Sequence, residues 1–271
     1  MLPAAAVQPN VLTYGPVTPL LAYGMAVLGS AVGLRCAMRT PGAEAREQAG
    51  WLALGSVAVG IGIFTMHVVA MIGFSVGGAP IDYDMVTTYG SLLLAVLVSA
   101  VALFVVSRRR PAWLAVLGGG VVLGLGAAAT HFTGMTAMRI AGAVRYEGRV
   151  MAIAAAVVVV VTTVALWCAR RIRHMGASVA AAVIMGTGFI AMQYLGMAGM
   201  SVRLFTDDGG VGSSSLGVLT PVLIGPVLVL LLITLFVSLD PMMERDGGRK
   251  WGTRPGEGAG EKLEWTPFES R

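Results

Sequence analysis

Seven long apolar stretches run along the chain, separated by short polar segments. None carries Asp, Glu, Lys or Arg in its interior, and Arg35 lies near the end of the first. A bilayer core about 30 Å thick is crossed by about 20 apolar residues in a helix, so each stretch is long enough to span it. The pattern predicts an all-α integral membrane protein with seven transmembrane helices, at residues 18–38, 50–74, 87–107, 112–138, 150–169, 176–200 and 216–239.

The composition supports this class of protein and excludes others. Hydrophobic residues make up 56% of the chain and charged residues 12%, whereas about 25% of an average soluble domain is charged. A water-soluble globule, a disordered chain and a disulfide-framed secreted domain are therefore excluded. The two cysteines, Cys36 and Cys168, lie beside arginines at span ends, and we expect both to be free thiols. The expected location is the plasma membrane, with the lipid bilayer as partner.

The positive charge is distributed as a topology signal. The net charge is +5, but the arginines form short clusters between the apolar stretches, so we expect no nucleic acid partner. Fifteen Lys and Arg residues fall in one set of alternate segments and four in the other. The positive-inside rule therefore predicts that the N-terminus lies outside and the C-terminus in the cytoplasm. His174, in a basic segment on the cytoplasmic side, is expected to be solvated.

One motif occurs three times, in the second, fourth and sixth stretches. The copies read GIGIFTMHVVAM at 60–71, GLGAAATHFTGM at 124–135 and GTGFIAMQYLGM at 186–197. Their central residues, His67, His131 and Gln193, recur at a nearly constant period without a gap. A regular internal repeat of this kind marks equivalent structural units. We therefore predict three two-helix repeats, followed by the seventh span as a closing helix.

The spacing within the motif places its polar and thioether groups together. Residues four apart lie on one helix face, so Met71, Met135 and Met197 project with the central residues of their own copies. Met138 and Met200 are expected to continue two of these stripes by one helical turn. The paired glycines would let neighbouring helices approach closely. All three centres lie about 10 Å below the outer rim of the membrane, so the stripes can converge on one site.

The donor atoms of these stripes indicate a soft metal. Imidazole and thioether groups without a nearby carboxylate suit copper, especially Cu(I), better than magnesium, calcium, manganese or zinc. Gln193 would orient a ligand or leave an open coordination position. The alternative is that the histidines form polar contacts between helices and the methionines are ordinary packing. The candidate metal site drawn from the residues is therefore His67, His131, Met71, Met135 and Met197, with Gln193 beside them.

At these motifs the sequence resembles the MHYT family of bacterial integral membrane sensor domains, over roughly residues 18–205. That family is named for a Met-His-Tyr-Thr motif, usually extended by Gly-Met. Thr130 and Gln193 depart from the pattern. The resemblance implies a sensor that binds copper and responds to oxygen, carbon monoxide, nitric oxide or redox state. Its implied ligands are Met66, His67, Met71, His131, Met135, Met192 and Met197.

The predicted organisation follows from these assignments. Residues 1–17 form an extracytoplasmic tail, 18–205 the MHYT-like sensor domain, 206–240 an outer loop with the seventh span, and 241–271 a disordered cytoplasmic tail. We assign no catalytic residue and expect no enzyme activity, so the signal would pass to a separate cytoplasmic partner. Two other functions stay open: a haem-b redox protein with His67 and His131 as axial ligands, and a copper transporter.

Overall fold

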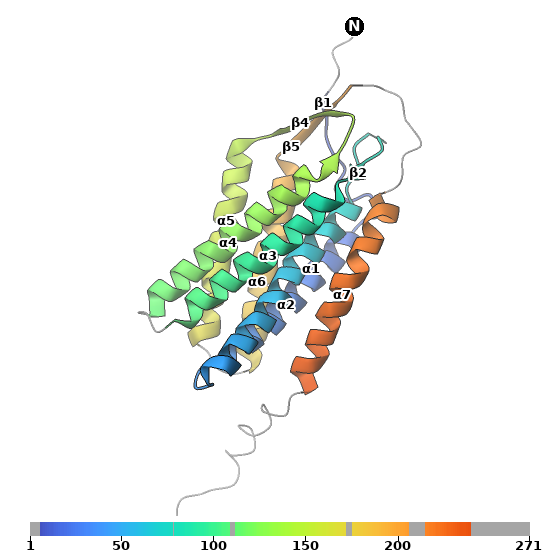
Figure 1. Ribbon diagram of the computed structural model, residues 1–271. Coiled ribbons are helices and arrows are strands. Elements are labelled where there is room, and N and C mark those ends of the chain that lie inside the picture. Colours follow the sequence, from blue (N-terminus) through green and yellow to red (C-terminus); the bar gives the residue numbers. More distant parts are fainter. Residues whose placement is uncertain (1–5, 78, 109–111, 172–174, 206–214, 240–271) are drawn as a thin grey trace, which may run out of the picture. The chain divides into compact units, whose positions relative to one another are not determined.

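The computed structural model describes residues 6–77, 79–108, 112–171, 175–205 and 215–239. It contains seven helices that are long and apolar enough to cross a membrane, as the hydropathy pattern predicts, and the chain is a multi-pass membrane protein (Figure 1). The helices are α1 (Val17–Met38), α2 (Ala45–Ile72), α3 (Met85–Ser107), α4 (Ala112–Thr136), α5 (Gly148–Arg171), α6 (Met175–Ala198) and α7 (Ser215–Leu239).

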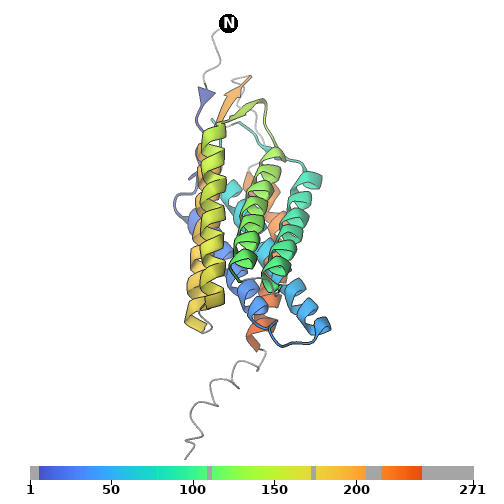
Figure 2. The ribbon, with the colours of Figure 1, turned by 90° about the vertical axis from the view of Figure 1, so that its left-hand side faces the viewer.

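The first six helices form a closed ring of three hairpins. Within each hairpin the two helices pack along their length, as α1 with α2, α3 with α4 and α5 with α6. Each hairpin also packs on the next one, and the last returns to the first through a contact of α6 with α1 (Figures 1 and 2). The motif-bearing helices α2, α4 and α6 touch one another inside the ring. The three predicted repeats are therefore arranged around a common centre.

The first glycine of each motif copy joins one hairpin to the next. A Cβ atom added at this glycine would lie 2.6 Å from an atom of a valine in the following hairpin, which is closer than carbon atoms pack. Only a residue without a side chain allows this approach, so the expected role of the glycines is confirmed. The three contacts are Gly60 with Val96, Gly124 with Val159, and Gly186 with Val27.

The second glycine of each copy packs within its own hairpin. The three contacts are Gly62 with Gly29, Gly126 with Val98, and Gly188 with Val161. Each partner lies two positions further along the chain than a valine that contacts a first glycine. Val98 follows Val96, Val161 follows Val159, and Gly29 follows Val27. The motif glycines therefore set both kinds of helix contact in the ring.

Helix α7 packs outside this ring, against the α1–α2 hairpin. Its apolar side chains meet a small cluster that includes Val32, Cys36, Ala58 and Ile61. At the end of α7, Arg39 Nη2 donates a hydrogen bond of 3.1 Å to the carbonyl oxygen of Val237. The closing helix expected from the sequence is thus attached to one hairpin. The α7 residues of this cluster are Leu230, Ile233 and Val237.

Short strands lie where α2, α4 and α6 end, and the sequence analysis did not predict them. They form one sheet of order β1-β5-β4 and one of order β2-β3. We call this end of the bundle the strand-bearing end (Figure 1). The strands are β1 (Ala6–Val7), β2 (Asp82–Tyr83), β3 (Met138–Arg139), β4 (Gly142–Tyr146) and β5 (Met200–Leu204).

The strands correct one detail of the predicted helices and add one to the predicted N-terminal tail. Met138 and Met200 do not extend the motif stripes, because α4 ends at Thr136 and α6 at Ala198, and both methionines lie in strands instead. The N-terminal segment is also held in place, since Val7 pairs with Val202 in β5. Pairing between distant segments, which leaves no local periodicity, decides both outcomes.

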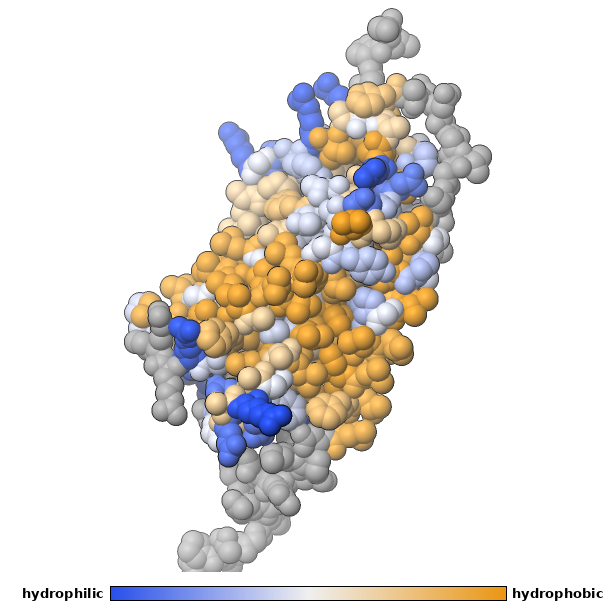
Figure 3. Space-filling view, viewed as in Figure 1, coloured by the Kyte–Doolittle hydropathy of each residue, from blue (hydrophilic) through white to orange (hydrophobic). Residues whose placement is uncertain are grey.

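The surface agrees with a membrane environment. Apolar residues cover the middle of the face seen in Figure 3, and hydrophilic residues gather towards its two ends. Cys36 is buried, Cys168 is partly buried, and both are free thiols as expected. His174, the predicted outer loop from 206 to 214 and the predicted tail at 241–271 lie outside the described residues.

Candidate functional site

The three motif centres meet inside the ring. His67, His131 and Gln193 lie in the last two turns of α2, α4 and α6, at equivalent positions in their helices. All three are buried, with exposed fractions of 3%, 1% and 0%. The expectation that the repeat centres share one interior is therefore confirmed. We call these three residues the motif centre.

One amide oxygen joins the two histidines. Gln193 Oε1 accepts a hydrogen bond of 3.0 Å from His67 Nδ1 and one of 2.8 Å from His131 Nδ1. A carbonyl oxygen has two lone pairs and cannot donate, so both rings carry their proton on Nδ1. Gln193 Nε2 lies 3.4 Å from Met197 Sδ on the next turn of the same helix. A single side chain thus ties all three inner helices together.

The two imidazole rings are also in direct contact. Their centroids are 5.3 Å apart and the rings are nearly perpendicular, at 89°. Axial ligands of a haem face each other across the porphyrin plane, each with one nitrogen on the iron. Here both rings direct Nδ1 at the same amide oxygen, and no porphyrin fits between rings in edge-to-face contact. This arrangement of His67 and His131 does not match an axial pair.

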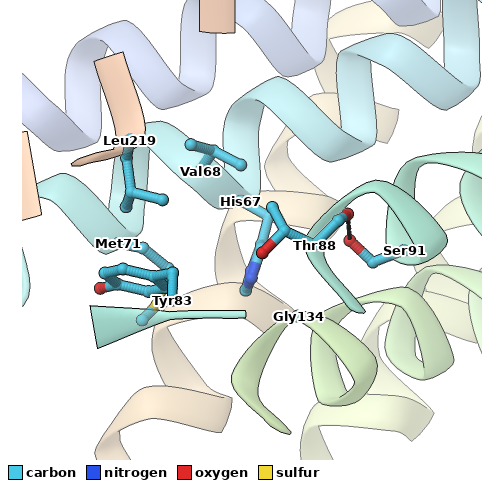
Figure 4. A pocket seen from close by; sticks show the side chains of 8 residues that line it. All are labelled: His67, Val68, Met71, Tyr83, Thr88, Ser91, Gly134 and Leu219. Atoms are coloured by element: carbon cyan, nitrogen blue, oxygen red, sulfur yellow. Dashed lines mark hydrogen bonds between the residues drawn. The ribbon is translucent and has the colours of Figure 1, made fainter. Parts of the chain in front are cut away.

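Each imidazole lies on a glycine of the next repeat. A Cβ atom added at Gly134 would lie 2.2 Å from His67 Nε2, and one added at Gly196 would lie 2.4 Å from His131 Nε2. Figure 4 shows the His67 ring beside Gly134 of α4. We call Gly134 and Gly196 the imidazole seats. The sequence analysis assigned them no role, although the Gly-Met pair of the last two motif copies was a signal for them.

The two Nε2 atoms have different surroundings. His131 Nε2 is buried and has no hydrogen-bond partner, so its lone pair is available. His67 borders a cavity of about 10 Å³, a volume close to that of one water molecule. The remaining lining residues, several of which Figure 4 shows as sticks, are Val68, Met71, Tyr83, Thr88, Ser91, Gly134 and Leu219.

The methionines predicted as ligands are all buried near the motif centre, but their directions differ. Met71, Met135 and Met197 lie one turn after the central residues and on the same helix faces. Met66 and Met192 directly precede a central residue, and adjacent side chains project about 100° apart around a helix. The second copy has Thr130 at that position, whose hydroxyl donates to the Gly126 carbonyl oxygen at 2.9 Å.

The groups around the motif centre are uncharged or soft donors. Across the part of the chain that the structure describes, no three His, Cys, Asp or Glu residues group closely enough to hold a metal. Any ion here would therefore depend on the two imidazoles and on thioether sulfur, the combination that favours Cu(I) among biological metals. Whether copper is bound stays a prediction.

Comparison with known proteins places this arrangement in a family. Residues 60–119 and 124–182 match the MHYT family, described as a bacterial signalling protein N-terminal repeat. The bifunctional diguanylate cyclase/cyclic di-GMP phosphodiesterase MucR of Pseudomonas aeruginosa is 34% identical over 239 residues, which are 86% of this chain and 35% of MucR. The cyclic di-GMP phosphodiesterase NbdA of the same bacterium is 30% identical over 196 residues, 69% of this chain and 24% of NbdA.

A third relative comes from another bacterium. The signaling protein YkoW of Bacillus subtilis is 31% identical over 157 residues, 54% of this chain and 19% of YkoW. The chain thus spans about a third of the length of MucR and less of the other two. No solved structure matches it. Since the matched segments contain the repeats built around His67 and His131, and the likeness to MucR extends over most of the membrane part, the chain belongs to the MHYT family of bacterial membrane signalling proteins.

Proposed function

We propose that this chain is a non-enzymatic membrane sensor that detects its signal at the motif centre through bound Cu(I). The observation that carries the proposal is the convergence of His67 and His131, from two different repeats, on one buried point. A pair of hydrogen bonds between helices needs no methionine one turn after each centre, yet all three copies have one. The signal is oxygen, carbon monoxide, nitric oxide or a change of redox state.

The donor set fits this metal. His67 and His131 would hold it through imidazole nitrogen, and Met71, Met135 and Met197 through thioether sulfur, with no carboxylate required. Bound Cu(I) would supply an open position for a diatomic ligand. Because both Nδ1 atoms now carry a proton and donate it to Gln193 Oε1, using them as ligands requires the amide to move away and each ring to carry its proton on Nε2 instead. The hydrogen bonds of Gln193 would therefore distinguish the free and bound states.

A change at the motif centre can be passed on because Gln193 connects three helices. A ligand shifts a conformational equilibrium only as far as it prefers one state over the other. Separating the amide from the two imidazoles removes contacts that hold α2, α4 and α6 together, which supplies such a preference. The receiver in this proposal is a separate cytoplasmic signalling partner.

The test is a thermal melt in detergent with Cu(I) or zinc, together with metal analysis of the purified protein. Binding to the folded state alone at a hundredfold excess over Kd raises stability by about 2.7 kcal/mol. We expect this gain for the parent with Cu(I), and its loss in His131→Ala. His174→Ala, which alters the third histidine of the chain, is the matched control and should behave as the parent. No copper-dependent shift in the parent would overturn the proposal and leave the histidines as contacts between helices.

A further inference from the structure

The third repeat has no imidazole, and its seat also differs. The ring order places His67 of α2 on Gly134 of α4, and His131 of α4 on Gly196 of α6. The next step leads from residue 193 of α6 back to α2, because α6 is followed around the ring by the first hairpin. The position equivalent to the two seats in that copy is residue 70, which is alanine.

The difference between glycine and alanine is decisive at such a position. At both seats an added Cβ would stand 2.2–2.4 Å from the imidazole Nε2, and both Nε2 atoms border backbone that cannot retreat without moving a helix. Ala70 is fully buried, with an exposed fraction of 0%. If the third repeat follows the geometry of the other two, its methyl group would stand where an imidazole at position 193 would lie.

We infer that Ala70 is a specificity-determining residue: it closes the third seat, so that the motif centre takes two imidazoles and one amide. Residue 193 is then glutamine, whose amide group is smaller than an imidazole ring and whose oxygen accepts a hydrogen bond from each of the two rings. Gln193 and Ala70 are a matched pair, just as His67 is matched with Gly134 and His131 with Gly196. The residues at positions 70 and 193 therefore depend on each other: alanine at 70 goes with glutamine at 193, and histidine at 193 would need glycine at 70.

The consequence for metal choice rests on the proposed function. Two imidazoles with thioethers suit Cu(I), whereas three imidazoles form a familiar zinc site. Ala70 would therefore keep the motif centre from becoming a three-histidine site that accepts zinc. The pairing itself can be tested in metal-free protein, independently of any copper.

The first experiment compares thermal unfolding of the parent, Gln193→His, Ala70→Gly and the double variant in detergent with a chelator. Ala70→Gly should lower the Tm of the parent, since it leaves a cavity and puts glycine in a helix. In the Gln193→His background the same change should raise the Tm by several degrees, because it opens the seat. An equal fall in both backgrounds would overturn the inference.

A second pair of variants keeps the test decisive if Gln193→His does not fold. Gly134→Ala should lower the Tm of the parent by several degrees, because its methyl group meets the His67 ring. In the His67→Gln background the same change should be neutral or raise the Tm, since it rebuilds at the first repeat the pair found at the third. A loss that is the same in both backgrounds would contradict the matched pairing.

The metal arm uses zinc alone as the probe, with the melts repeated after removal of the chelator. Zinc should raise the Tm of the double variant Gln193→His and Ala70→Gly but not that of the parent. If the metal-free coupling is found and zinc stabilises neither protein, the pairing stands and the inferred role of Ala70 in metal choice is wrong, whereas the proposed Cu(I) function is tested separately by the melts with Cu(I). If zinc stabilises the parent equally, Ala70 does not set metal choice and that part of the inference is wrong.

Discussion

His131 Nδ1 donates a hydrogen bond of 2.8 Å to Gln193 Oε1, and the same oxygen also accepts a hydrogen bond from His67 Nδ1. The oxygen is thus the only partner the structure gives to either Nδ1 atom among the described residues. Buried donors that lose their acceptor are costly. The stability of the ring therefore depends on one amide group more than on either imidazole.

Replacing Gln193 by leucine should lower the free energy of unfolding by about 1–3 kcal/mol, because two buried N–H donors lose their acceptor. Unfolding by heat in detergent, followed by circular dichroism, measures the effect. Gln48→Leu, at a partly buried position in the first turn of α2, is the control and should change little. Equal stability of the parent and Gln193→Leu would show that these hydrogen bonds contribute nothing to the fold.

The contact between Gly124 and Val159 predicts that one methyl group added at Gly124 destabilises the fold. A Cβ at Gly124 would lie 2.6 Å from the Val159 Cα, so Gly124→Ala must push α4 and α5 apart and should cost about 1–3 kcal/mol. Gly90→Ala in α3 is the matched control, since nothing lies within 4 Å of its added Cβ. This control should be neutral or stabilising by up to about 1 kcal/mol. If both variants melt like the parent, the close approach of the helices is not required.

Asp84 lies outside the membrane-spanning part and caps the N-terminus of α3. We predict that it stabilises the protein less at low pH. Its Oδ2 accepts hydrogen bonds from the Thr87 hydroxyl at 2.5 Å and from the Thr87 backbone N–H at 2.9 Å. These bonds, and more weakly the charge of Arg139, hold the pKa of Asp84 below its ordinary value of 3.8. A depressed carboxyl pKa gives stability that is present above the ordinary value and is lost as the pH falls through the folded one.

The measurement is the Tm of the parent and of Asp84→Asn across pH. The parent should be the more stable of the two at pH 5 and above (about one unit over the ordinary pKa), and the two curves should converge below pH 3.8. A difference that stays constant down to about pH 3 would show that the ionised carboxylate is not the stabilising form.

The orientation of the chain is a prediction from charge alone. Fifteen of the 19 Lys and Arg residues lie in segments assigned to one side, so a reporter fused at the C-terminus should be active in the cytoplasm. Reporters placed after α3 and after α4 should give opposite results, with the first cytoplasmic. A C-terminal reporter active only outside the cytoplasm would reverse the assignment, and the motif centre would then face the inside.

Much of the fold follows from local pattern. Long apolar runs without charge give the seven helices, and the G-x-G pairs give the helix contacts, because only glycine permits a carbon of a neighbouring helix to come this close. The common depth of His67, His131 and Gln193 follows from the constant period. These features depend on helix geometry, which is the same wherever the residues occur.

The rest depends on contacts between distant segments. The strands formed by Met138 and Met200 arise from pairing across the strand-bearing end, and neither residue has a local signal for it. The sharing of Gln193 Oε1 by two rings requires side-chain directions that spacing does not give. The position of α7 beside the first hairpin is one of three that the ring offers, and the sequence repeat treats the three alike.

Three separate copies of one hairpin could assemble into the same ring, since each hairpin meets the next through the same type of head-to-tail contact. Such a trimer would carry three identical centres, with three histidines or three glutamines, and three identical seats. Joining the hairpins in one polypeptide removes that restriction, so each copy can change alone. A centre of two imidazoles and one amide cannot form from three identical hairpins. It requires hairpins that differ in sequence, as they do within this single polypeptide.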